Sequence, residues 1–387
     1  HGLDVIGYHL VNLLIHLINS LLIYWFVNLI FITLDSGGGY KSLFHNHASI
    51  AALFTSLLFV THPIQTQAVT YIVQRFASLA TMFYLFSIIM YIKFRLTLDG
   101  GNKNCRGEKI GISPLTYYLL ALLAAVLAMK TKEIAFTLPV MIALYEFLFF
   151  KGETKSRILY LAPFIFTMLI IPATLLYMGG VAMATRLATD MPRLDYLFTE
   201  FRVIITYIRL IFFPVDQNLD YDYPIYHSMF NPEVFLSFMA LLISFITVTY
   251  FFYRYRKTLP VIRVIFFGTA WFFATLSVES SIIPIVDVIF EHRMYLPSLG
   301  IFLVISVLLI MIIDRCRQKL VEGTVFLSVI IISLVFTGIT YSRNNLWNDE
   351  IVLWQDVVSK SPGKARGYIN LASFYYDKRD YDSLIEA

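Results

Sequence analysis

Residues 290–313 read FEHRMYLPSLGIFLVISVLLIMII, a short charged run that leads directly into an apolar stretch. An α-helix needs about 20 mostly apolar residues to cross the hydrocarbon core of a membrane, and the part from Met294 onward is long enough. Glu291, His292 and Arg293 are costly at the end of a membrane helix unless something pairs with them or uses them. The stretch therefore predicts a transmembrane helix with a candidate site at its beginning.

The composition of the whole chain agrees with this local pattern. Hydrophobic residues make up 58% of the 387 residues and charged residues 14%, whereas a soluble domain has roughly 45–50% and about 25%. The net charge of +4 is small for this length and argues against a nucleic-acid partner. The two cysteines, Cys105 and Cys316, lie too far apart in sequence to form a motif, so we expect neither a disulfide nor a cysteine metal site.

Apolar stretches of spanning length follow one another along the chain, and they predict an all-α, polytopic bundle of transmembrane helices. His62-Pro63 ends the second stretch, because proline disfavours helix in the residue before it. The spans that we predict are residues 8–34, 48–61, 77–95, 114–130, 134–150, 157–178, 233–253, 260–278, 294–313 and 322–340.

The orientation follows from the Lys and Arg residues in the short loops, which mark the cytoplasmic side. They cluster in four loops: Lys93 to Lys109, Lys151 to Arg157, Arg254 to Arg263, and Arg315 to Lys319. Counting spans then places the remaining connections on the periplasmic or lumenal face: residues 1–7, 62–76, 131–133, 179–232, 279–293 and everything after about residue 341. One apolar segment, residues 199–213, would break this alternation, and we interpret it as an interfacial or re-entrant helix that turns Arg202 and Arg209 to headgroups or a cavity.

The composition becomes soluble towards the end of the chain. We predict a transmembrane domain over residues 1–341, an amphipathic linker over 342–363 that contains a helix over 343–362, and a first, incomplete tetratricopeptide repeat over 364–387. The repeat would start an α-solenoid, and about three repeats are needed for a stable stack, so we expect more to follow. Its packing residues would be Asn370, Leu371, Ala372, Tyr375, Tyr381 and Leu384, with the turn between its helices at Lys378–Asp380.

The first candidate binding segment runs from His62 to Arg75, a polar turn between two spans. A guanidinium is always charged and binds phosphate in a bidentate way, so Arg75 is a candidate phosphate ligand. His62 and Gln74 are candidates for the wall of the same substrate site. The structural alternative for Arg75 is an anchor that extends to lipid headgroups.

A tight charged turn, Lys130-Thr131-Lys132-Glu133, is the second candidate. Lys132 would neutralise a lipid phosphate if it is buried. Glu133 is a candidate substrate contact, and its alternative role is to interact favourably with the dipole at the start of the next helix.

Two further outer segments carry acids and aromatic residues. In residues 214–226, carboxylates alternate with tyrosines, which suits carbohydrate, and Asp220 and Asp222 are the candidates; a solvated loop with turn-forming residues would produce the same pattern. Glu291, His292 and Arg293 share one outer loop with Glu279 and Asp287, and an ion pair between Glu291 and Arg293 is the structural alternative. The histidines have no metal-ligand spacing.

These motifs occur in a particular order: Gly7 to Asn12 with His16 and Asn19, then His62 to Arg75, Lys132-Glu133 with Pro139, Glu291 to Ser298, and a linker containing Trp347. The succession resembles the transmembrane and tetratricopeptide repeat-containing O-mannosyltransferases and their bacterial relatives, within the C-type glycosyltransferase superfamily. Gln67 departs from the pattern, because relatives often have an acid there, and Gln74 precedes Arg75. These departures leave open a donor or an acceptor different from that of the animal enzymes.

The resemblance implies an integral membrane glycosyltransferase that moves a sugar from a polyprenyl-phosphate donor to a Ser or Thr hydroxyl of a protein, on the periplasmic or lumenal face. It implies no certain cofactor and leaves a divalent cation open. The catalytic carboxylate is expected upstream of His1, and we do not assign that role to Asp4. The cations expected to bind the donor phosphate are Arg75, Lys132, Arg202 and Arg293; the other substrate contacts are His62, Gln74, Glu133, Asp220, Asp222, Glu291 and His292.

The expected partners are the lipid bilayer, the lipid-linked sugar and an acceptor protein held by the repeats, and the expected location is a bacterial inner membrane with the repeats outside. Two other classes of function remain. One is a membrane-anchored scaffold, or an accessory subunit of a larger complex, with a vestigial transferase domain. The other is a transporter, which the lack of an internal repeat of spans disfavours.

Overall fold

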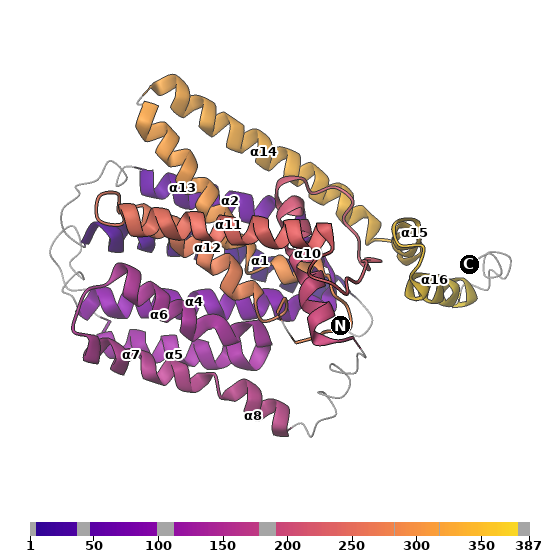
Figure 1. The fold of residues 1–387 in the computed structure, drawn as a ribbon, viewed down its shortest axis with the longest axis horizontal. Coiled ribbons are helices and arrows are strands. Elements are labelled where there is room, and N and C mark those ends of the chain that lie inside the picture. The colour runs from indigo at the N-terminus through magenta and orange to yellow at the C-terminus, as the bar shows by residue number, and fades with distance from the viewer. Residues whose placement is uncertain are drawn as a thin grey trace.

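The computed structural model describes residues 5–36, 47–98, 112–177, 191–281, 283–316 and 318–377, and every regular element within these ranges is a helix. Figure 1 shows them as a bundle from which one long helix and two short ones extend. The long helices are α1 (Ile6–Ser36), α2 (Ala48–Thr61), α4 (Arg75–Leu98), α5 (Pro114–Thr131), α6 (Leu138–Phe149), α7 (Thr154–Thr167), α8 (Ile170–Tyr177), α10 (Arg193–Phe212), α11 (Pro232–Tyr255), α12 (Ile262–Leu276), α13 (Ser298–Cys316), α14 (Lys319–Leu346), α15 (Glu350–Lys360) and α16 (Ala365–Asp377). The short ones are η2 (Pro63–Gln65), α3 (Thr66–Thr70), η3 (Ile72–Gln74), η4 (Glu133–Thr137) and η5 (Glu291–Met294).

Within these ranges, seven helices are long and apolar enough to cross a membrane, or eight if the bent pair Ala48–Thr61 and Pro63–Thr70 is one span. The predicted all-α polytopic class is therefore confirmed. Three predicted spans, 48–61, 134–150 and 260–278, are shorter helices than a straight crossing needs. The predicted span 157–178 corresponds to Thr154–Thr174, which is long and apolar enough to cross, although a short turn separates α7 from α8 within it.

The core of the bundle is made of close-packed aromatic side chains and small residues. Trp271 of α12 is fully buried and contacts Phe26 of α1 and Tyr84 of α4. α12 and α13 approach so closely at Gly268 and Gly300 that a Cβ on either glycine would collide with the backbone of the other helix. Small residues allow such close helix contacts in membranes, where packing rather than the hydrophobic effect drives association.

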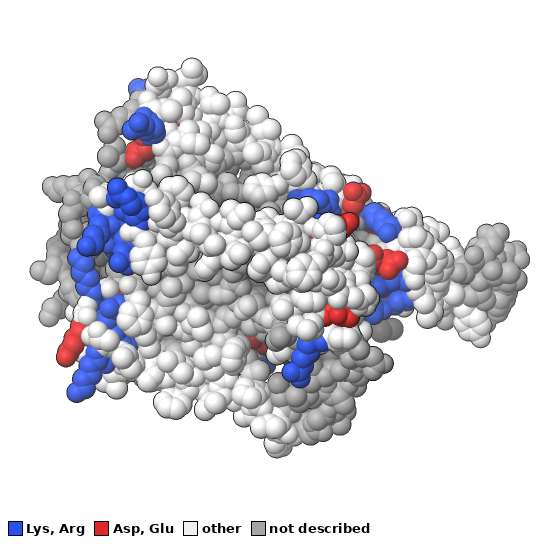
Figure 2. All heavy atoms as spheres, in the orientation of Figure 1, with Lys and Arg blue, Asp and Glu red and all other residues white. Residues whose placement is uncertain are grey.

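Lys and Arg residues of the loops α6–α7, α11–α12 and α13–α14 gather at one end of the bundle, on the left in Figure 2. We call this the basic end. The shared location of these three loops matches the sequence prediction, whereas the predicted loop residues 103–109 lie outside the described residues. At the basic end, the buried Glu146 carboxylate accepts hydrogen bonds from Arg95 at 3.0 Å and from Arg157 at 3.1 Å, and so connects α6 to α4 and α7.

The opposite end, which we call the site end, contains the short connections 62–74 and 132–137, the loops 213–231 and 277–297, and the start of α15. Contacts between these segments hold them together: Gln67 bonds to the backbone of His292, Lys132 pairs with Glu279, and Thr70 bonds to Asn344 of α14. Counting spans in the sequence had predicted this common face.

The C-terminal helices depart from the prediction of one linker helix over 343–362, which is wrong. α14 continues to Leu346, and Asp349 begins a separate helix, α15, by capping the backbone N–H groups of Ile351 and Val352. α15 and α16 lie side by side beyond the bundle (Figure 1), with Gln355 donating to the Tyr375 hydroxyl. The second helix of the predicted repeat would lie in residues 378–387, outside the described residues.

Candidate functional site

A polar stripe on α1 holds the helix against the segments that form the site. Asn12 donates to the carbonyl of Val69, and His16 and Asn19 both contact the hydroxyl of Tyr295 at 2.7 and 3.1 Å. These residues repeat at helical spacing, so one face of α1 presents all of them. The α1 part of the motif pattern therefore has a structural function, which is to position the segment that begins α13.

The His62-Pro63 break re-aims the chain at the end of α2. The backbone bends by 55° there, and the two ring nitrogens of His62 contact the N–H of Ile64 and the carbonyl of Ile211. The short helices that follow bring Gln65 to the hydroxyl of Ser298 and Gln67 to His292. His62 is thus a buried turn residue in this conformation.

Gln74 ends the short helix η3 and Arg75 begins α4, and both are partly exposed. The Arg75 guanidinium lies 5.0 Å from the ring centroid of Tyr8 and donates to the carbonyl of Ile72. These contacts hold the partly exposed Arg75 beside α1 and η3.

Lys132 and Arg293 meet around two acids at the site end. Lys132 Nζ lies 2.8 Å from Glu279 Oε1, and Arg293 Nη1 lies 4.0 Å from Glu200 Oε1. Arg293 also donates to the carbonyl of Glu279 at 3.4 Å, so the two pairs are adjacent. We call Lys132, Glu200, Glu279, His292 and Arg293 the buried charge cluster; the side chains of its Arg and Lys are 3% and 14% exposed.

Backbone carbonyls fix the guanidinium of Arg293. Its Nη1 donates to Val288 at 2.9 Å and its Nη2 to Asp287 at 2.6 Å. The extended turn before η5 places these carbonyls around the guanidinium, and Tyr207 of α10 bonds to both the N–H and the carbonyl of Phe290. The cation is therefore preorganised by the loop rather than free to move.

Burial and neighbouring charges act in opposite directions on the two acids. Burial alone would raise the pKa of Glu279, but Lys132 and Arg293 lower it to about 2. Burial raises the pKa of Glu200 to about 7, against the opposing effects of Arg293 and of the nearby Ser280 and Tyr196 hydroxyls, which make no hydrogen bond of good geometry to its carboxylate. Burial, with help from Lys132, also lowers the pKa of His292 well below its usual value.

These shifts set the charge of the cluster near neutral pH. His292 is neutral, and Glu279 offsets one of the two cations. When Glu200 is protonated, one positive charge remains, and when it is ionised the cluster is neutral. The cluster therefore favours an anion below about pH 7.

The Glu291 carboxylate faces away from this cluster. It accepts hydrogen bonds from Gln217 at 2.7 Å, the N–H of Asn218 at 2.9 Å and the Tyr221 hydroxyl at 2.5 Å. The ion pair with Arg293 that the sequence left open is thus wrong. Glu291 instead ties the loop 213–231 to the start of η5.

The acids of the outer loops bind the chain that leads to α16. Asp220 is buried and lies 2.7 Å from Lys364, and Asp287 lies 3.2 Å from Lys364 and 3.1 Å from Arg366. The backbone N–H of Asp222 donates to the Ser361 hydroxyl, while the Asp222 side chain is exposed. In this conformation the predicted carbohydrate acids hold the linker, and Glu133 lies partly exposed at the start of η4.

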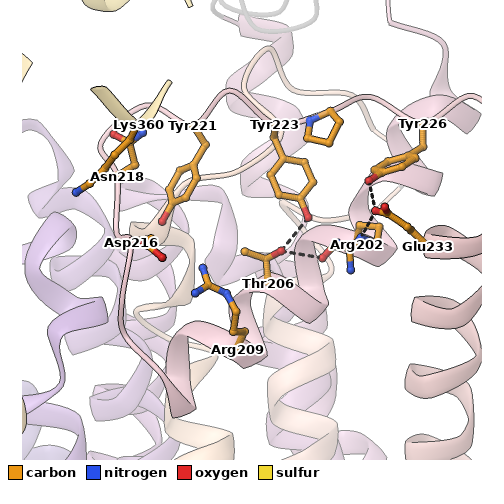
Figure 3. Close-up of a pocket in the computed structure, with 11 residues that line it drawn as sticks. Arg202, Thr206, Arg209, Asp216, Asn218, Tyr221, Tyr223, Tyr226, Glu233 and Lys360 are labelled. Atoms are coloured by element: carbon orange, nitrogen blue, oxygen red, sulfur yellow. Dashed lines mark hydrogen bonds and ion pairs between the residues drawn. The ribbon is translucent and has the colours of Figure 1, made fainter. Parts of the chain in front are cut away.

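Arg202 lies apart from the cluster, in a groove of about 620 Å³ between α10, the loop 213–231 and the end of α15. Figure 3 shows Arg202, Thr206 and Arg209 on one side and three tyrosines that point towards them on the other. Arg202 pairs with Glu233 at 3.3 Å. Asp220 and Asp222 are not among the lining residues, which are Arg202, Thr206, Arg209, Asp216, Asn218, Tyr221, Tyr223, Pro224, Tyr226, Glu233 and Lys360.

The sequence pattern did not indicate that Glu200 belongs to the site, or that the tyrosines of residues 214–226 face α10. The only local signal for Glu200 was an acid within an apolar stretch of an amphipathic helix, which is costly unless it is used or paired. Within the described part of the chain, no three His, Cys, Asp or Glu side chains lie where they could share a metal ion.

The fold defines a polytopic membrane protein, with a cluster of buried cations and acids at one end. The chain is similar to a protein O-mannosyl-transferase of Caenorhabditis elegans, at 24% identity over 97% of this chain and 49% of the relative. It is also similar to one of Mus musculus, at 30% identity over 38% of this chain and 19% of the relative, and to one of Drosophila melanogaster, at 36% identity over 24% and 11%. No protein-family model and no solved structure matches the chain.

These relatives confirm the resemblance to the transmembrane and tetratricopeptide repeat-containing O-mannosyltransferases. The chain spans about half of the length of the C. elegans relative, and a fifth or less of the lengths of the M. musculus and D. melanogaster relatives. The match to the C. elegans protein covers the bundle as well as the linker.

Proposed function

We propose that this chain is the membrane part of a glycosyltransferase that moves a sugar from a polyprenyl-phosphate donor to a Ser or Thr hydroxyl of a protein. The names of its relatives support the reaction class, and the helical bundle supports a membrane location. The proposal includes an acceptor held by repeats on the periplasmic or lumenal side, and a bacterial inner membrane as the location.

The buried charge cluster carries the proposal. Lys132 and Arg293 come from distant parts of the chain and meet at one point, with more positive than negative charge when Glu200 is protonated. A phosphate is the anion that a lipid-linked donor would bring there. Because Arg293 is held by carbonyls in advance, it needs no reorganisation when the charge on the leaving phosphate grows.

The reaction that we propose is a displacement with inversion. The acceptor hydroxyl oxygen bonds to the anomeric carbon of the sugar, and the bond from that carbon to the phosphate oxygen breaks. The electron pair leaves with the lipid phosphate, which Lys132 and Arg293 stabilise. The hydroxyl proton goes to a carboxylate that the described residues do not identify.

Lys130 is a matched control for Lys132. It lies two residues earlier in the chain and is exposed, and its ammonium donates to the hydroxyl of Thr174. Full-length protein in lipid nanodiscs is incubated with a polyprenyl-phosphate sugar and hydroxyl-bearing peptides, and transfer is measured by mass spectrometry. We expect Lys132→Met to reduce the transfer rate by about 10²- to 10³-fold, as for loss of one transition-state charge contact. Lys130→Met is expected to transfer at the wild-type rate.

Equal rates for the two variants would remove Lys132 from the donor site. No transfer by the wild-type protein to any hydroxyl acceptor, with repeats that still bind a partner, would favour the scaffold alternative.

A further inference from the structure

The groove beside α10 has an arrangement that the charge cluster does not explain. Tyr221, Tyr223 and Tyr226 project from the loop towards the face of α10 that carries Thr206 (Figure 3). Each hydroxyl is already bonded at the edge of the groove: Tyr221 to Glu291, Tyr223 to Thr206 and Tyr226 to Glu233. These bonds fix the rings, so that aromatic surface lines the space between them.

Three cations, Arg202, Arg209 and Lys360, and two acids, Asp216 and Glu233, line the groove. Arg202 is paired with Glu233, and Lys360 lies 2.7 Å from Asp356. Arg209 donates to the carbonyl of Val215, so each of the three cations already has a partner. Because its cations are already bonded, the groove offers little free positive charge to a phosphate, and its ionic side chains would oppose a lipid tail.

Fixed aromatic rings beside amide, carboxylate and guanidinium groups match the chemistry of a sugar. The apolar C–H face of a pyranose packs on an aromatic ring, and its hydroxyls bond to planar polar groups at the ring edge. Asn218, Asp216 and Arg209 supply both donors and acceptors of this kind, and the volume of about 620 Å³ admits a small saccharide.

α10 presents different faces to the groove and to the buried charge cluster. Glu200 and Tyr207 face Arg293, whereas Thr206 and Arg209 line the groove. With 3.6 residues per turn, these two pairs point in different directions from the helix axis. A sugar joined directly to a phosphate at Arg293 therefore would not also extend into the groove.

We propose that the groove is a second saccharide site, which binds a sugar that the acceptor already carries. The proposal rests on the proposed function for the identity of the acceptor, but the presence of a saccharide site does not depend on transfer. The transferase would then prefer acceptors that already carry a sugar near the hydroxyl.

Direct binding tests the site without a donor. Saturation-transfer NMR is recorded on the purified full-length protein in nanodiscs with methyl hexosides and hexose disaccharides. We expect contact signals from the ring protons, and Tyr223→Ala is expected to weaken the affinity about tenfold, the scale of one aromatic contact. Tyr223→Phe keeps the ring but loses its bond to Thr206, so it is expected to lose less affinity than Tyr223→Ala; Tyr376→Ala, which removes an exposed tyrosine outside the groove, is expected to bind like wild type.

Three arms distinguish the source of the sugar. Glycosylated peptide, the same peptide without its sugar, and the lipid-phosphate sugar are titrated against wild type and Tyr223→Ala. Loss of affinity for the glycosylated peptide alone supports the proposal. Loss for the lipid-phosphate sugar alone would assign the groove to the donor, and equal binding of both peptides, or no saccharide signal in wild type, would overturn the saccharide site.

These outcomes are separable from those of the transfer assay. If Lys132→Met transfers normally but Tyr223→Ala loses saccharide binding, the proposed donor site fails and the groove stands. If Lys132→Met loses transfer while Tyr223→Ala binds every saccharide as wild type does, the groove fails and the donor site stands.

Discussion

The two ends of the bundle both bury acids beside cations, but they satisfy them differently. At the basic end, both Glu146 oxygens are bonded: one accepts from Tyr91 and Arg95, and the other accepts from Arg157. At the site end, Glu200 makes no hydrogen bond of good geometry among the described residues, although Ser280 and Tyr196 lie near it, and it reaches Arg293 only at 4.0 Å. A saturated network braces helices, whereas an incompletely bonded one keeps the capacity to bind something else.

The largest expected effect is at the basic end. Glu146→Ala leaves Arg95 buried without its carboxylate, and removing one partner of a buried ion pair typically costs about 3–5 kcal/mol. We expect the detergent-solubilised variant to unfold at a much lower temperature than wild type, measured by loss of the monodisperse peak in size-exclusion chromatography after heating. A variant as heat-stable as wild type would show that the saturated network does not brace the bundle.

Arg293→Lys tests whether Arg293, at the site end, binds the donor or only braces the structure. Lysine keeps the charge but loses the fork that contacts the carbonyls of Asp287 and Val288. We expect transfer to fall by about 10²-fold or more, with a smaller change in heat stability than Glu146→Ala produces. Normal transfer together with a large loss of stability would make Arg293 a structural brace like Arg95.

Glu200 gives the site end a pH dependence, because its pKa is about 7. Between the ordinary glutamate pKa of about 4.5 and pH 7, the folded protein holds a proton that the unfolded chain has lost, so the stability falls as the pH rises through this window. We expect Glu200→Gln to flatten the pH dependence of the free energy of unfolding between about pH 4.5 and 7, by on the order of 1–3 kcal/mol, measured from unfolding temperatures across this range.

Donor binding gives a second readout for the same variant. Glu200→Gln keeps the excess positive charge of the cluster at every pH, so its affinity for a lipid phosphate should stay constant where that of wild type declines above about pH 7. Equal pH profiles for the two proteins, in both stability and binding, would show that Glu200 does not titrate in this range.

The smallest expected effect is at the linker. Asp287→Asn weakens the contacts to Lys364 and Arg366, which are partly exposed, and such pairs are worth about 0–1 kcal/mol each. We expect the transfer rate to change little, while amide hydrogens of α16 exchange faster by mass spectrometry. Unchanged exchange would mean that Asp220 alone holds the linker.

Much of the fold followed from local sequence. The predicted span 8–34 and the helix α1 agree closely, because a long apolar run fixes a membrane helix without reference to its neighbours. The same reasoning overestimated 134–150 and joined 343–362 into one helix. Those errors lie where backbone turns depend on tertiary contacts, as at η4, or on a cap such as Asp349.

The candidate site divides in the same way. Lys132 and Arg293 were predicted from their type and position, and the structure brings them to one cluster. Arg75, Arg202 and Asp220 were predicted by the same argument, and they lie instead on Tyr8, in the groove and against Lys364. The sequence shows that a charged loop residue needs a partner, but it does not show which of many possible partners that residue contacts.

The amino-acid sequence alone predicts that this chain is a helical membrane protein. It also indicates which segments share one face and which family the chain resembles. These properties depend on apolar length, on loop charge and on the order of motifs, all of which are readable along the chain. The tertiary structure alone shows that Glu279 lies between Lys132 and Arg293, that Glu200 is buried beside Arg293, and that the tyrosines of the outer loop face α10. Charge pairing and ring orientation arise from residues far apart in sequence, and their energies depend on distance and burial, which the chain order does not contain.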